Sequence, residues 1–220
     1  MYENFIMKIQ YEIKELRTNI FTVIVPDGYH RAMLFLRCQE FYESPNDRFR
    51  GENFSIWDFI EWYSREHNDK FSYPYDWCGF NIPFETMTTC MKGCEWLESP
   101  YDLQMETILT EIDNMRDKTL KSYVIGVDTT DSSTYTHELC HGLYYINDEY
   151  KQIADELTHS LNRTDYNGFK KVLLDMGYTD SVIDDEIQAF IMTNFGHFKK
   201  VTNNIKELHE RYQVKLKKFL

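Results

Sequence analysis

The chain has 220 residues and a formal net charge of −12, and 42% of its residues are hydrophobic and 27% charged. This composition is typical of a soluble globular protein, and the length favours a single domain over residues 1–220. The negative charge argues against nucleic-acid and membrane partners. With no recognisable signal peptide and no apolar run of about 20 residues, we expect a cytoplasmic protein.

Residues 1–115 are predicted to form an N-terminal lobe whose role its sequence does not indicate. Apolar residues at helical spacing predict a helix over 4–17, and a β-branched run predicts a buried strand over 19–25. A turn at 26–28 introduces another helix, and Ser55 is placed to cap a further one. The aromatic, proline-broken segment 71–84 is predicted to be a packed loop. Ser99 and Pro100 suit the N-cap and N1 positions of a long helix.

Residues 116–220 are predicted to form the core that carries the chemistry. The stretch KSYVIGV, residues 121–127, predicts a second strand, and a helix over 134–148 follows it. Apolar stripes at helical spacing then predict four more helices, the third of them over 181–194. The expected fold class is α+β, mostly helical, with a small sheet beside the helix at 134–148.

The cysteines give no disulfide framework. There are five of them, an odd number without regular spacing, which indicates reduced thiols in an intracellular protein. Cys90 and Cys94 lie four apart on a probable helix, but a metal site there would need further ligands nearby.

The segment YTHELCHGLYY, residues 135–145, contains the HExxH pattern at 137–141. At helical spacing His137 lies about 40° from His141, Glu138 lies about 60° to the other side, and Leu139 and Leu143 lie on the opposite face. Two imidazoles one turn apart suit a single tetrahedral zinc ion. Glu138 is angled away from that ion and suits a general base that takes a proton from the zinc-activated water. The simpler alternative is an amphipathic helix on which three polar residues coincide.

This segment resembles the signature of the zincin metallopeptidases. Thr134 stands three places before the first histidine, the surrounding residues are uncharged, and hydrophobic Leu143 closes the pattern. The resemblance covers about 30 contiguous residues and one distant carboxylate. It implies a zinc cofactor, ligands His137 and His141, Glu138 as the catalytic base, and an edge strand at 121–127 that lines the substrate cleft.

The third ligand is not part of the motif. Tyr144 and Asn147 stand where the metzincin pattern needs glycine and histidine, so the resemblance points to the gluzincin branch, whose third ligand is a later glutamate. On the predicted helix over 181–194, Glu186 is centred on the apolar face, where a metal ion would compensate its charge, whereas Asp184 and Asp185 are directed toward solvent. We therefore expect Glu186 as the third ligand. The alternatives considered were Glu149, Glu156, Asp175, Asp184, Asp185 and His197.

The sequence predicts a zinc-dependent hydrolase, with a peptide or protein as its substrate and metallopeptidase activity as the default. Tyr144, Tyr145, Tyr178 and His197 are candidates for stabilising an oxyanion, and none is singled out. Two alternatives stay open. One is a binding protein that keeps a zincin scaffold without turnover, and the other is a zinc amidase that acts on a non-peptide substrate.

Overall fold

The computed structural model describes residues 9–93 and 99–220, and these form two compact units, Met1–Thr130 and Asp131–Leu220. Helices predominate and one small mixed sheet accompanies them, so the α+β expectation is confirmed. Cys94, half of the cysteine pair considered above, lies outside the described residues. Within the described ranges, no helix has both the length and the apolar character needed to cross a membrane.

The sheet belongs to the first unit and has the order β1-β2-β4-β3. Its strands are β1 (Glu12–Arg17), β2 (Ile20–Ile24), β3 (Phe80–Pro83) and β4 (Tyr123–Val127). β2 pairs with β1 antiparallel and with β4 parallel, and β3 pairs with β4 antiparallel. β4 is therefore an interior strand with all five residues buried, not the edge strand that the zincin resemblance implied.

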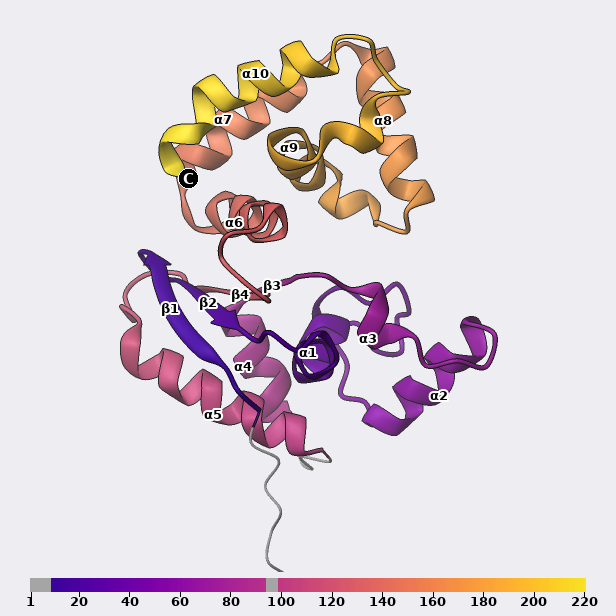
Figure 1. The fold of residues 1–220 in the computed structure, drawn as a ribbon, viewed down its shortest axis with the longest axis vertical. Coiled ribbons are helices and arrows are strands. Elements are labelled where there is room, and N and C mark those ends of the chain that lie inside the picture. The colour runs from indigo at the N-terminus through magenta and orange to yellow at the C-terminus, as the bar shows by residue number, and fades with distance from the viewer. Residues whose placement is uncertain (1–8, 94–98) are drawn as a thin grey trace, which may run out of the picture. The chain divides into compact units, whose positions relative to one another are not determined.

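In the part of the first unit that the structure describes, the sheet is accompanied by the helices α1 (Gly28–Glu43), α2 (Ile56–Glu66), α3 (Tyr73–Asp76), α4 (Phe84–Gly93) and α5 (Pro100–Met115). In Figure 1, α1, α4 and α5 lie on the same side of the sheet. Ser55 caps α2, and Ser99 caps α5 in a capping box with Asp102, as their sequence positions predicted. The Asp102 carboxylate also forms a buried two-bond pair with Arg37 of α1, which joins the two helices.

Two predictions for the first unit were wrong. Residues 12–17 form strand β1 instead of continuing a helix, because they complete the ladder of β2 and leave most of their side chains exposed at the sheet edge. The rest of that predicted helix lies partly outside the described residues. Segment 71–84 is packed, as expected, but it contains α3 and β3. β3 pairs with β4, a contact distant in sequence that local patterns do not reveal.

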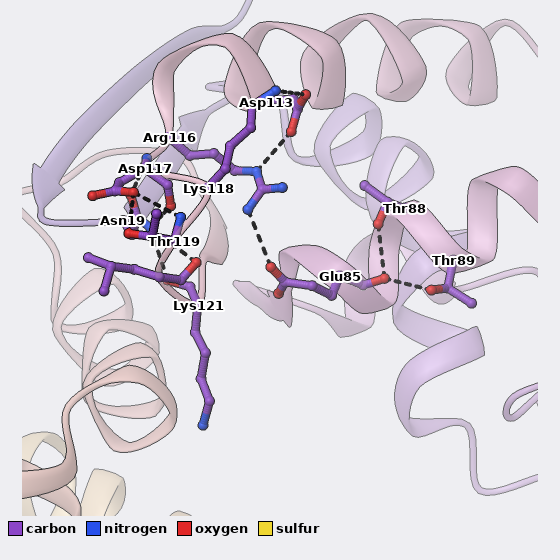
Figure 2. Close-up of polar contacts among 11 residues, drawn as sticks. Asn19, Glu85, Thr88, Thr89, Asp113, Arg116, Asp117, Lys118, Thr119 and Lys121 are labelled. Atoms are coloured by element: carbon purple, nitrogen blue, oxygen red, sulfur yellow. Dashed lines mark hydrogen bonds and ion pairs between the residues drawn. The ribbon is translucent and has the colours of Figure 1, made fainter.

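Asn19 fixes the turn between β1 and β2 against the segment that leads into β4. It adopts a left-handed backbone conformation with φ of 58°, which asparagine tolerates better than most residues. Its amide nitrogen donates to the carbonyl oxygens of Asp117 and Lys121, and its amide oxygen accepts from the Asp117 nitrogen (Figure 2). Nearby, Arg116 at the end of α5 bridges Asp113 and Glu85 and so ties α5 to α4.

The second unit is helical throughout its regular structure. It comprises α6 (Ser133–Ile146), α7 (Asp148–His159), α8 (Arg163–Asp175), α9 (Ile183–Thr193) and α10 (Ile205–Leu216), with short 3-10 turns at Asp180–Val182, Phe195–Phe198 and Lys217–Phe219. α9 contacts α6, α7, α8 and α10, so it lies at the centre of this unit (Figure 1). Gly177, with φ of 100°, follows the end of α8, where a glycine in the left-handed region commonly terminates a helix.

Candidate metal centre

Helix α6 carries the HExxH residues on one face. The Ser132 side chain accepts a hydrogen bond from the Tyr135 nitrogen at its start, and Asn147 ends it. Leu139 and Leu143 are buried on the opposite face, as the helical wheel predicted. The helix ends two residues before the predicted position 148, because Asn147 also caps α7.

Helix α9 supplies the distant carboxylates. Glu186 is buried, as its place on the apolar face predicted, and only 9% of its side chain is exposed. Asp184 is half-buried and accepts hydrogen bonds from Tyr166 and His159. Asp185, which we expected to point toward solvent, instead contacts His141.

The three predicted ligands converge. One ligand atom from each of His137, His141 and Glu186 lies within 4.8 Å of the other two, and this is the group that could hold a metal ion among residues 9–93 and 99–220. The two Nε2 atoms are 3.2 Å apart, and they lie 3.7 Å and 3.6 Å from the two Glu186 oxygens. A tetrahedral zinc ion with bonds of about 2.0–2.1 Å separates its ligand atoms by about 3.3 Å. The observed distances therefore suit one ion held by all three residues.

Each histidine makes a second contact that leaves its Nε2 free to bind. The Thr193 hydroxyl donates to the Ala189 carbonyl oxygen, so it can only accept from the His137 Nδ1–H, 3.2 Å away. The His141 Nδ1 lies 2.9 Å from a carboxylate oxygen of Asp185, to which it must donate. A histidine that donates through Nδ1 in this way presents the Nε2 lone pair to a metal.

The electrostatics of the group favour a bound cation. Burial raises the pKa of Glu186 from 4.5 to about 7, although His141 opposes this. Its Oε2 atom is buried without a hydrogen-bond partner. An orphaned carboxylate oxygen is costly unless a positive charge compensates it, so this atom indicates that the residues present fit a metal ion.

The two histidines differ in basicity. Burial, and then the neighbouring His141, lower the pKa of His137 from 6.5 to about 4. Burial also opposes the charging of His141, but the Asp185 and Glu186 carboxylates outweigh it and raise the pKa of His141 well above its ordinary value. A metal ion must therefore displace a proton from His141, whereas His137 is already neutral at pH 7.

Glu138 is buried beside the group but is not among the three ligand residues. Its carboxylate is close enough to both histidines to favour their charged forms. Its role as the catalytic base stays a prediction.

The remaining candidates separate into near and distant residues. The Phe190 ring packs edge-on against His137 with 4.7 Å between centroids, and Tyr178 and His197 each pack against Phe190. The Tyr144 hydroxyl donates to Asp155, so it is engaged away from the ligands. The other carboxylates make contacts elsewhere: Glu149 with Lys218, Glu156 with Gln152, and Asp175 with Lys171.

Sequence reasoning missed Thr193 and the true position of Asp185. Thr193 lies seven positions after Glu186, about two turns along the same helix, so it shares the face of Glu186, and that spacing was the available signal for it. Asp185 lies about 100° round the helix from Glu186, so only the packing of α6 against α9 brings it to His141. Comparisons with protein-family models, curated proteins and solved structures find no match for this chain.

Proposed function

We propose that this chain is a zinc-dependent hydrolase that resembles the zincins, with peptides or proteins as its substrates. The observation that carries the proposal is the convergence of His137, His141 and Glu186 on one point, with a buried Glu186 oxygen that has no hydrogen-bond partner. Two imidazoles and a carboxylate are the ligand set typical of catalytic zinc sites that keep a fourth position open.

The roles of the residues follow from their contacts. His137, His141 and Glu186 would hold the ion, which supplies Lewis acidity and lowers the pKa of water when bound. Thr193 and Asp185 orient the two imidazoles through their Nδ1 atoms. Glu138 accepts the proton that water releases as it attacks a carbonyl group, and it can return that proton to the leaving nitrogen.

The direct test combines metal analysis with a turnover assay on the full chain. Protein purified without a metal-binding tag should contain one zinc per chain by elemental analysis. A peptide-library digest should then reveal cleavage that stops with a chelator and returns with added zinc. Zinc binding without cleavage of any peptide would favour a silent binding protein or an amidase for non-peptide substrates, and absence of zinc would refute the proposal.

A further inference from the structure

A chain of buried hydrogen bonds leads away from the candidate metal centre. Gln188 of α9 and Tyr150 of α7 are both completely buried. The Tyr150 hydroxyl lies 2.7 Å from the Gln188 Oε1, and the Gln188 Nε2 lies 2.8 Å from the Asp185 Oδ1. The same Oδ1 atom receives the contact from the His141 Nδ1. The chain thus connects Tyr150 to a ligand through two intermediate side chains.

The Asp185 carboxylate determines the direction of every hydrogen bond in this series. An ionised Asp185 can only accept, so both His141 and Gln188 must donate to it. Gln188 therefore turns its amide nitrogen toward Asp185 and its oxygen toward Tyr150, which must donate.

Burial makes this arrangement costly unless every partner is in place. A glutamine amide without solvent contact must satisfy both its donor and its acceptor inside the protein. Asp185, in contrast, is partly exposed, with 26% of its side chain accessible. It could rotate toward water if nothing held it, so the bond from Gln188 restrains the carboxylate in the position where it receives the His141 proton.

We propose that Gln188 and Tyr150 are positioning residues that act through Asp185 to hold the His141 imidazole with its Nε2 directed at the metal. The proposal rests on the proposed zinc site, but the orientation of the His141 ring can be measured in the protein without any metal. Loss of a partner beyond the ligands typically weakens metal affinity by about 10–100-fold. Gln188 should therefore matter for zinc although it lies too far along the chain of contacts to bind it.

The test uses two variants and one control. Gln188→Met keeps the volume of the side chain but removes its hydrogen bonds, and Tyr150→Phe removes a single hydroxyl. Tyr212→Phe is the matched control, because Tyr212 is equally buried in the same unit but its hydroxyl pairs with Thr158. Zinc dissociation constants are measured by competition with a chromogenic chelator, and folding is compared by circular dichroism and melting temperature.

We expect Gln188→Met to weaken zinc binding by about 10–100-fold, Tyr150→Phe to weaken it less, and Tyr212→Phe to leave it unchanged. If Gln188→Met does not fold, Tyr150→Phe against Tyr212→Phe decides the question. Equal zinc affinity in Tyr150→Phe and Tyr212→Phe, with both folded, would overturn the proposal.

A second measurement needs no metal. Long-range proton–nitrogen NMR spectra of the metal-free protein report the Nδ1–H of His141 and its exchange with solvent, with the signal assigned by its loss in His141→Gln. We expect a slowly exchanging Nδ1–H in the parent and faster exchange in Gln188→Met or Tyr150→Phe. Unchanged exchange in both variants would refute the positioning role. A parent that binds no zinc but shows this Nδ1–H effect would refute the proposed function and support the positioning role.

Discussion

The Nε2 atoms of His137 and His141 lie 3.2 Å apart, while the Nδ1 atom of each ring faces an acceptor on α9. With both Nδ1 atoms donating, two neutral rings would turn their lone pairs toward each other. Such an approach is repulsive unless a cation lies between the nitrogens or one ring carries a second proton. The raised pKa of His141 shows which ring would carry it, so a proton and a metal ion compete for the same place.

His137→Ala should therefore abolish stoichiometric zinc binding and lower the melting temperature of the zinc-loaded protein. The substitution removes one of the three proposed ligands, and a metal that binds only the native state stabilises that state. Elemental analysis and thermal unfolding with and without zinc give the measurement. His159→Ala is the control, since His159 is exposed and pairs with Asp184, which is not one of the three proposed ligands. One tightly bound zinc per chain in His137→Ala would place the site elsewhere.

Glu186→Gln should weaken zinc binding markedly, whereas Asp184→Asn should leave it nearly unchanged. Both substitutions replace a carboxylate on α9 by an amide, but only Glu186 faces the two histidines. The Asp184 oxygens instead accept hydrogen bonds from Tyr166 and His159. Isothermal titration with zinc measures the affinity of both variants. An equal or larger loss of zinc affinity in Asp184→Asn would show that Glu186 was wrongly assigned as the ligand.

The part of the site that the sequence predicted depends on helical geometry alone. The spacing of His137, Glu138 and His141 places them on one face of a helix whatever surrounds it. The apolar residues one turn before and after Glu186 likewise place it on the buried face of its helix. The structure adds that these two helices pack against each other. No single-helix pattern contains that information, because it depends on which apolar faces meet.

The parts that the sequence missed depend on contacts between distant segments. Asp185 was assigned to solvent because a helical wheel does not show that α6 covers that side of α9. Strand β3 was hidden in an aromatic loop, because its partner β4 lies about 40 residues further along the chain. Residues 12–17 have an ambiguous pattern, and pairing with β2 decides their conformation.

Glu40 of α1 should make the stability of the protein pH-dependent. Burial raises the pKa of its carboxyl group from 4.5 to about 7, and the hydroxyls of Ser44 and Tyr73 only partly oppose this. Because the folded state holds the proton more tightly than the unfolded state, this contribution is fully present below pH 4.5 and is lost as the pH rises through 7. The loss amounts to about 3 kcal/mol of unfolding free energy.

Urea denaturation at pH 4.5 and pH 8 measures this effect by comparison with Glu40→Gln, which cannot ionise. The stability of the variant relative to the parent should rise by about 3 kcal/mol between the two pH values. Glu61→Gln, at an exposed position paired with Arg65, serves as the control and should follow the parent. If the unfolding free energies of Glu40→Gln and the parent change by the same amount between pH 4.5 and pH 8, Glu40 does not titrate in this pH range.

Glu138→Gln separates an enzyme from a binding protein that keeps the same site. The substitution keeps the size of the side chain but removes its ability to take a proton from water. The variant should bind zinc about as tightly as the parent and melt at the same temperature, because Glu138 is not among the three ligand residues. Its rate of peptide hydrolysis should fall by about 10²–10⁴-fold, the usual contribution of a general base.

Single-turnover cleavage of a peptide taken from the library digest measures that rate, with zinc content determined on the same samples. Equal rates in the parent and in Glu138→Gln would show that another group accepts the proton, whereas loss of zinc in Glu138→Gln would make Glu138 a ligand instead of the base.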